Sequence, residues 1–391
     1  KTRFIQLFSR WCHMVRKNLT LSVVKKFIPA RKAKSRKGDN GIVLVVGGSY
    51  IYHGAPILSS LAALKCGTDL VYTSVPKINV SSTRAISPNL IVIPLVDQKL
   101  TLGAVNKLIG ALPRNLHSAT IGMGLAIQEK NSLLHFVKSL LDRDVRLSLD
   151  ASALIPDVLP LLANKNVVVT PHAGEFRRLF GESPSNSKND RIKLVEKNAK
   201  EFGITVLLKG ATDVISNGSA TYLNEKKTPA MTVGGTGDVL SGLVAGLLSN
   251  NRNPLESAAA ATFINGLAGK SAQKKLGLHM TSMDLLDEIP SVMKPFDRIL
   301  WLDMIPTKYV DSHMYEIVLD LQTLIRQPSV SAKNEGIEEC AKLVQKLLKK
   351  SGVKSEILRL KKGVAPIVYG EIKSKQNPSK TLMFYNHYDV Q

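Results

Sequence analysis

The stretch IVLVVGGSYIYHGAPILSSLAALKCGTDLVYTS, residues 42–74, shows the pattern that decides the fold class. It predicts a β-branched strand over Ile42–Val46, a helix over Ile57–Cys66 with apolar residues at helical spacing, and a second strand over Leu70–Ser74. Short apolar runs that alternate with longer helical segments are typical of a parallel sheet wrapped by helices.

The same alternation continues to about residue 300. Further strands are expected at Leu90–Leu95, Ala119–Gly122, Arg146–Asp150, Val167–Thr170, Thr205–Lys209 and Thr221–Leu223. Further helices are expected at Leu102–Leu112, Lys130–Arg143, Gly174–Phe180, Arg191–Phe202, Gly237–Ser249 and Leu255–Lys274. The strand runs are mostly apolar, which indicates cover on both faces of the sheet. The sequence therefore predicts a three-layer α/β fold with a mainly parallel central sheet.

Length and composition narrow the class of protein. The chain has 391 residues, of which 44% are hydrophobic, so it can bury a large core and divide into two or more domains. No apolar run approaches the roughly 18 residues that span a bilayer. The three cysteines are scattered and show no paired metal-ligand spacing. We expect a soluble, cytoplasmic protein with no membrane partner.

A formal charge of +22 raises the question of a polyanionic partner. The first 40 residues are dense in Lys and Arg and hold a single acidic residue, Asp39. The sequence has neither an aromatic-interleaved RNA motif nor a zinc-knuckle spacing, so we expect no nucleic-acid partner. We interpret residues 1–19 as a basic N-terminal extension, a solvated arm.

The most informative local motif is Gly234-Gly235-Thr236-Gly237-Asp238, which precedes an apolar helix. Glycines let backbone N–H groups converge on an anion, and a helix N-terminus adds partial positive charge there. A carboxylate at this point lies beside the phosphoryl group and can take a proton from a hydroxyl. Asp238 is the predicted catalytic base; the alternative is a turn in which Asp238 caps the helix.

A second motif, Thr170-Pro171-His172-Ala173-Gly174-Glu175-Phe176, follows a predicted strand. Ligands bind at the carboxyl ends of strands in doubly wound sheets. There His172 can hydrogen-bond a substrate, and Glu175 can organise magnesium-bound water near phosphates. The alternative is a capping Glu beside an ordinary surface His.

Weaker signals come from a strand that ends in Lys-Gly and from pairs of glycines. In Leu208-Lys209-Gly210-Ala211-Thr212-Asp213, Lys209 can reach a nucleotide phosphate while the turn wraps the adenosine half. Gly47-Gly48 and Gly122-Met123-Gly124 follow other strands and permit a close approach of a ligand.

In this order along the chain, the motifs resemble those of the NAD(P)H-hydrate dehydratases, a branch of the ribokinase-like superfamily. The resemblance covers about residues 20–300 and runs through Arg36-Lys37-Gly38-Asp39-Asn40-Gly41, GGS at 47–49, GAP at 54–56, GMG at 122–124, TPHAGEF at 170–176, LKGATD at 208–213 and GGTGD at 234–238. It implies a ribokinase-like fold in which a phosphoryl-transfer site performs a dehydration.

The resemblance also implies residue roles. Ala55, Gly124, His172 and Asp238 would contact the hydrated nicotinamide nucleotide. The adenine nucleotide would bind Lys209, Gly210, Ala211, Thr212, Asp213, Gly234, Gly235, Thr236 and Gly237.

The implied substrates are the S epimers of NADH hydrate and NADPH hydrate, with Mg²⁺ as cofactor and AMP and phosphate as the other products. We choose ADP over ATP as phosphoryl donor because stand-alone members of the family tend to use it; no residue decides the choice physically. The epimerase domain of many relatives has no room upstream, so we expect this chain to rely on a separate epimerase or on spontaneous epimerisation. A homotetramer is implied by resemblance.

After about residue 300 the alternation stops. We interpret 301–314 as a linker and 315–391 as a partial α/β C-terminal segment. Its expected helices are Tyr315–Ile325 and Gly336–Lys350, and its expected strands lie near Ser355–Leu360, Ile367–Ile372 and Thr381–Tyr385.

This segment resembles the truncated N-terminal piece of a dizinc metallopeptidase of the aminoacylase and dipeptidase type. The resemblance rests mainly on Leu324–Ser331, Val368–Ile372 and Asn386–Gln391. It implies that His387 is the first zinc ligand and that Asp389 orients it. The remaining ligands would lie beyond Gln391, so we expect no peptidase activity.

Three other functions remain open at this point. A hydroxyl kinase of the same fold, acting on a vitamin precursor, would leave a stable phosphorylated product. A zinc peptidase would use the C-terminal segment, and a non-catalytic module would only bind nucleotide.

Overall fold

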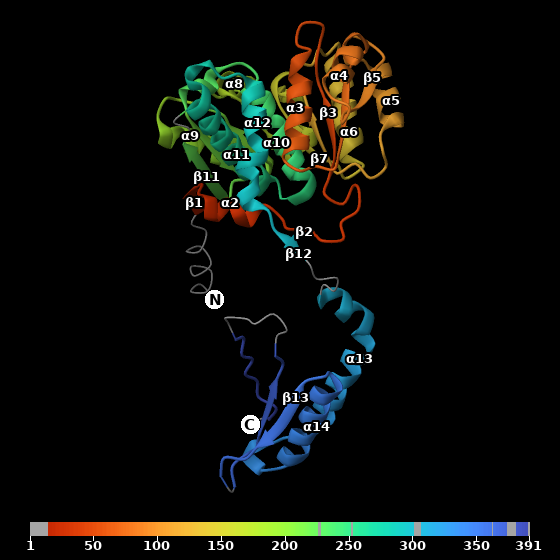
Figure 1. The fold of residues 1–391 in the computed structure, drawn as a ribbon, viewed down its shortest axis with the longest axis vertical. Helices are drawn as coiled ribbons and strands as arrows, with labels where there is room; N and C mark the ends of the chain where they lie inside the picture. The colour runs from red at the N-terminus through yellow and green to blue at the C-terminus, as the bar shows by residue number, and fades with distance from the viewer. Residues whose placement is uncertain are drawn as a thin grey trace, which may run out of the picture. The chain divides into compact units, whose positions relative to one another are not determined.

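The computed structural model describes residues 15–225, 228–251, 253–300, 306–361, 363–373 and 381–389. The chain divides into two compact units, residues 1–301 and residues 302–391 (Figure 1). Each unit is described by itself.

Within the described residues of unit 1, ten strands form one sheet. In spatial order they are β1 (Val15–Asn18), β11 (Ala220–Glu225), β10 (Thr212–Ser216), β9 (Thr205–Leu208), β8 (Val167–Val169), β7 (Arg146–Leu149), β6 (Ser118–Ile121), β3 (Ile42–Val46), β4 (Leu70–Pro76) and β5 (Ile91–Leu95). All neighbouring pairs are parallel except β9–β10 and β10–β11. The predicted mainly parallel sheet is confirmed.

The strand order reverses at β3. From β3 the chain adds β4 and β5 on one side and then returns to place β6, β7, β8 and β9 on the other. Ligands of open α/β sheets bind where the order reverses, outside the carboxyl ends of the strands. At this point the β3 and β6 loops are joined, because Gly48 N–H donates to the Met123 carbonyl (2.8 Å). The glycine pairs after β3 and after β6 therefore meet at the point where the strand order reverses, called here the switch point.

Helices cover both faces of the sheet (Figure 1). On one face lie α2 (Leu21–Phe27), α3 (Gly54–Lys65), α10 (Thr236–Asn251), α11 (Pro254–Leu276) and α12 (Ser282–Met293). On the other lie α5 (Leu102–Ala111), α6 (Lys130–Leu141), α7 (Leu159–Leu162), α8 (Ala173–Phe180) and α9 (Lys188–Phe202), with α4 (Val80–Ile86) beside β5.

A large hydrophobic core lies on each face of the sheet, and a third, smaller cluster includes Val43, Val45 and Val71. In β8, Val167 and Val169 pack into one core and Val168 into the other, because alternate side chains of a strand point to opposite faces. All three are fully buried, as the continuous apolar run predicts.

Some elements of unit 1 differ from the prediction. The interpretation of 1–19 as a detached extension is wrong from Val15 onward, because β1 pairs in parallel with β11. Arg16 holds it there, since its Nη2 lies 2.6 Å from Oε2 of the buried Glu196. The elements β10, α2, α4, α7 and α12 were not predicted from the sequence. Two-residue strands β2 (Arg31–Lys32) and β12 (Ile299–Leu300) pair with each other. Residues 1–14 of the predicted extension lie outside the described residues.

The described residues of unit 2 form two α-helices and a hairpin. They are α13 (Pro306–Arg326), α14 (Ile337–Lys350), β13 (Lys354–Leu358) and β14 (Ile367–Glu371), the two strands being antiparallel. The predicted linker 301–314 is wrong from Pro306, where α13 begins; residues 301–305 are not described. The predicted strand Thr381–Tyr385 is also wrong: this segment has no regular structure and its side chains are exposed, since no described strand pairs with it.

No helix in the described ranges combines the length and the apolar character that crossing a membrane requires.

Candidate active site

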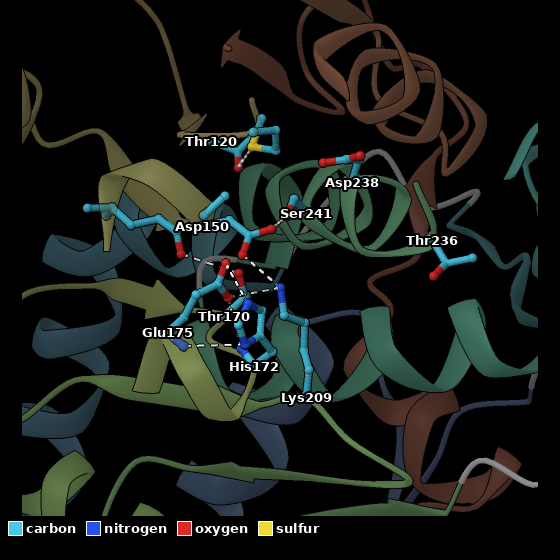
Figure 2. A network of polar contacts seen from close by, with 12 residues as sticks. Thr120, Asp150, Thr170, His172, Glu175, Lys209, Thr236, Asp238 and Ser241 are labelled. Carbon is cyan, nitrogen blue, oxygen red and sulfur yellow. Dashed lines mark hydrogen bonds and ion pairs between the residues drawn. The ribbon is translucent and has the colours of Figure 1, made fainter. Parts of the chain in front are cut away.

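The candidate site lies at the carboxyl ends of the parallel strands of unit 1. Asp150 follows β7, Thr170 and His172 follow β8, and Lys209 follows β9. The N-terminal turn of α10, which carries Asp238, faces the same edge (Figure 2). Strand ends and a helix N-terminus therefore meet where the sheet topology predicts a ligand.

A buried ion pair lies at the centre of this edge. Lys209 Nζ lies 2.9 Å from Asp150 Oδ1 and 3.6 Å from Glu175 Oε2. The other oxygen of Asp150, Oδ2, accepts a hydrogen bond from the Ser241 hydroxyl of α10. Figure 2 shows Lys209, Asp150 and Ser241 directed toward one another.

The pair keeps both of its members charged. Burial alone would raise the pKa of Asp150, but the charge of Lys209 and hydrogen bonds from Lys209 and Ser241 outweigh it and lower that pKa. Burial alone would lower the pKa of Lys209, but Asp150 and Glu175 raise it overall. Lys209 is therefore a protonated ammonium at neutral pH, although only 18% of its side chain is exposed.

Asp238 is the third residue of α10, inside the helix rather than before it. Burial, with the charges of Asp150 and Glu175, raises the pKa of Asp238 to about 6, although Lys209 opposes this. A carboxylate with this pKa is ionised at neutral pH and still binds a proton readily, which suits a general base.

His172 and Glu175 form a capping box at the start of α8. His172 Nδ1 accepts from the N–H groups of Gly174 (3.0 Å) and Glu175 (3.3 Å), and Glu175 Oε2 accepts from the His172 N–H (2.9 Å). Because Nδ1 accepts, Nε2 carries the ring proton, and it lies 3.4 Å from Glu175 Oε1. The side chain is 60% exposed, so capping and substrate contact are both available to His172.

The role of Glu175 in organising magnesium-bound water stays a prediction. Its carboxylate is 10% exposed and already contacts its own helix cap and Lys209. Among the described residues, no group of three or more His, Cys, Asp or Glu side chains could hold a metal ion. The described side chains alone therefore do not form a magnesium site.

A cavity of about 560 Å³ opens beside Lys209. Its lining includes the predicted nucleotide residues Lys209, Gly210, Ala211, Thr236 and Gly237. A methyl group at Gly237 would lie 3.8 Å from Lys209 Nζ, so the ammonium faces the bare backbone of this helix start.

Four predicted nucleotide residues do not line this cavity: Thr212, Asp213, Gly234 and Gly235. The Asp213 carboxylate is fully buried, accepts from Gly210 N–H (3.0 Å) and contacts the Thr262 hydroxyl, so it holds the turn in shape. The remaining lining residues were not predicted, because none of them belongs to a recognisable sequence motif. They are Thr228, Pro229, Met231, Thr232, Leu240 and Asn265.

Two of the predicted substrate residues, Ala55 and Gly124, lie at the switch point. A methyl group at Gly124, whose φ is +62°, would lie 3.4 Å from Ala55 Cβ, so these two positions are neighbours. On the same helix as Ala55, the Ser59 hydroxyl donates to the Asp238 carbonyl (2.7 Å) and joins α3 to α10.

In unit 2, His387 Nδ1 lies 3.4 Å from Asp389 Oδ1, and 71% of the His387 side chain is exposed. A carboxylate that lies beside an imidazole in this way can orient the ring of a zinc ligand. The zinc role of His387 stays a prediction.

Comparisons with known proteins agree with the site. A family profile described as NAD(P)H-hydrate dehydratase matches residues 43–291. The ADP-dependent (S)-NAD(P)H-hydrate dehydratase of Nitrosopumilus maritimus (strain SCM1) is 85% identical over 287 residues, which are 73% of this chain and 100% of that protein. The protein of the same description from Cenarchaeum symbiosum (strain A) is 64% identical over 276 residues, 71% of this chain and 96% of that protein.

Among solved structures, the ADP/ATP-dependent NAD(P)H-hydrate dehydratase from Bacillus subtilis, co-crystallised with ATP and Mg²⁺, has a TM-score of 0.64 at 26% identity. The structural match covers 72% of this chain and 99% of the Bacillus subtilis chain. The predicted ribokinase-like fold is thereby confirmed. On the motifs, the fold and these matches, the chain belongs to the NAD(P)H-hydrate dehydratase family.

Proposed function

We propose that the chain is a hydro-lyase that uses ADP to dehydrate the S epimers of NADH hydrate and NADPH hydrate, restoring NADH and NADPH and releasing AMP and phosphate. The observation that carries the proposal is the position of Asp238, with its raised pKa, in the same N-terminal turn of α10 as Thr236 and Gly237, which line the 560 Å³ cavity together with Lys209. The relatives from Nitrosopumilus maritimus and Cenarchaeum symbiosum are described as ADP-dependent (S)-NAD(P)H-hydrate dehydratases.

The chain's residues supply a phosphoryl-transfer step. Asp238 takes the proton of the ring hydroxyl, whose oxygen then bonds to the terminal phosphorus of ADP while the bond to the AMP oxygen breaks. Lys209 and the backbone N–H groups at the start of α10 stabilise the negative charge of the phosphates.

The second step explains why such a site performs a dehydration. Hydroxide is a poor leaving group, whereas phosphate leaves readily. The ring nitrogen supplies the electron pair as the C–O bond breaks, and loss of a proton from the neighbouring carbon restores the double bond of reduced nicotinamide. A hydroxyl kinase of the same fold would stop after the first step.

Several further properties belong to this proposal. Magnesium would accompany the nucleotide phosphates, since the described side chains do not form a site for it alone. A separate epimerase would convert the R epimers, the assembly would be a homotetramer, and the reaction would take place in the cytoplasm.

We propose no peptidase activity for unit 2. A competent zinc site needs three or more protein ligands, whereas only His387 and Asp389 come together here among the described residues. A titration should show no tight dinuclear zinc site; binding of two equivalents would contradict the proposal.

The direct test mixes the chain with NADH hydrate, magnesium and either ADP or ATP, and follows the return of reduced-nicotinamide absorbance. Recovery with ADP that is lost in Asp238→Asn supports the proposal. No recovery with either nucleotide, or a stable phosphorylated product, contradicts it and favours the kinase or a non-catalytic module.

A further inference from the structure

The buried carboxylate of Asp150 has no role in the proposed chemistry, yet it contacts two of the elements that build the site. It follows β7 and is 3% exposed. One oxygen pairs with Lys209 after β9, and the other accepts from Ser241 on α10. Asp150 therefore joins the nucleotide-binding lysine to the helix that carries Asp238 (Figure 2).

The geometry points to Asp150 as a positioning residue that fixes the Lys209 ammonium toward the start of α10, where the phosphoryl group of the nucleotide binds. This inference rests on the proposed function. Asp150 does not touch the substrate; it acts through Lys209.

Lys209 needs such a partner because its side chain is flexible and mostly buried. A lysine ammonium on a four-carbon stem has several rotamers and loses its proton readily when it is desolvated. The pair at 2.9 Å selects one rotamer and keeps the ammonium charged. Its Nζ then lies near Gly237, where the absence of a side chain leaves the approach to phosphate open.

Ser241 gives the contact its direction. It lies three residues after Asp238, so the two share one face of α10. By holding one oxygen of Asp150, Ser241 leaves the other in line with Lys209. A carboxylate that only filled a space in the core would not need both oxygens bonded to functional elements.

The test replaces Asp150 by its neutral isostere. In Asp150→Asn we expect ADP affinity, measured by calorimetry with ADP and magnesium alone, to fall about tenfold, and kcat for NADH hydrate to fall by up to about 100-fold. Asp157→Asn is the matched control, because Asp157 forms a surface ion pair with Lys130 (2.6 Å) and should change neither quantity.

Two further readouts separate positioning from a merely structural role. The groups that face Asp238 are Asp150, Lys209 and Glu175, and the charge of Asp150 raises the pKa of Asp238. The acid limb of kcat/KM should therefore move to lower pH in Asp150→Asn. A structural defect would lower activity at every pH without moving the limb.

The second readout is a double-mutant cycle with Lys209→Met. If Asp150 acts through Lys209, the double variant should bind ADP no more weakly than Lys209→Met alone. This variant also removes both buried charges, so it should fold even if Asp150→Asn does not.

ADP affinity and pH dependence that stay at wild-type values in Asp150→Asn, or losses in the double variant that multiply, would overturn the inference. A wild-type chain that binds ADP but does not repair NADH hydrate would instead contradict the proposed function, and the ADP measurement would still decide the role of Asp150.

Discussion

Asp238 and its charged neighbours determine the chemistry at the scale of single residues. Asp150 and Glu175 add negative charge beside Asp238, and Lys209 opposes them. The balance keeps Asp150 ionised and makes Asp238 the more basic carboxylate. Carboxylates whose environments separate their pKa values commonly divide the work of a site, one as base and one as fixed charge.

The pH dependence of activity follows from this arrangement. Only ionised Asp238 can take the proton of the hydroxyl, and burial raises its pKa to about 6. We expect kcat/KM to fall as the pH drops below about 6, and kcat of Asp238→Asn to be lower by roughly 10²–10⁴. A pH–rate profile checks both; an acid limb near pH 4 would show that Asp238 is not the group that titrates.

The same carboxylate should cost stability. Its folded-state pKa lies above the ordinary value of 3.8, so the folded state binds the proton more tightly than the unfolded state does. Stability therefore falls as the pH rises from about 4 to about 6, and the loss persists above that range. Asp238→Asn should raise Tm by a few degrees at pH 8 and leave it unchanged near pH 3.5. A lower Tm at pH 8 would contradict this sign.

At the scale of elements, one side chain both starts a helix and faces the site. His172 caps α8 through Nδ1, and its Nε2 lies 3.4 Å from Glu175 Oε1 on a side chain that is 60% exposed. His172→Ala should cost about 1 kcal/mol of stability together with activity, whereas His172→Asn supplies another capping oxygen. We expect His172→Asn to keep the wild-type Tm and to have a lower kcat/KM. Equal activity of His172→Asn and wild type would show that His172 acts only as the N-cap of α8.

The packing of α3 against α10 depends on the glycine at position 242 of α10. A methyl group at Gly242 would lie 2.0 Å from the Ser59 carbonyl oxygen, so Gly242→Ala must push the two helices apart. We expect a loss of about 2–3 kcal/mol in urea unfolding, together with lower activity, because the same contact positions Asp238.

Gly110→Ala is the matched control. Gly110 lies in α5 with no atom within 4 Å of the added methyl, so the change should stabilise by about 0.5–1 kcal/mol. Equal effects of the two substitutions would show that α3 and α10 do not pack as described.

At the scale of the whole molecule, the candidate dehydratase site belongs entirely to unit 1. All of the site's residues precede residue 301. The relative from Nitrosopumilus maritimus is matched over 100% of its own length by 287 residues of this chain. A chain that ends at Leu300 should fold and keep kcat within about twofold of the full chain. Thermal unfolding and the NADH hydrate assay test this; loss of ADP binding would show that unit 2 contributes to the site.

Local patterns in the sequence determined the alternation of strands and helices and the positions of the glycine motifs. Strand, helix and phosphate-binding patterns depend on residues a few positions apart, so they can be recognised in the sequence without the tertiary structure. The resemblance carried by the order of these motifs determined the family. Local patterns failed at β1 and at Thr381–Tyr385, because whether a short segment becomes a strand depends on a partner that is distant in sequence.

The electrostatics of the site were decided only by the tertiary structure. Asp150 is 59 residues from Lys209 and 91 residues from Ser241 along the chain. No local sequence pattern predicts that these three side chains come into contact. The pKa of Asp238 depends on its burial and on the charges of Asp150, Lys209 and Glu175. These groups come together only when three strand ends and a helix start are packed against one another.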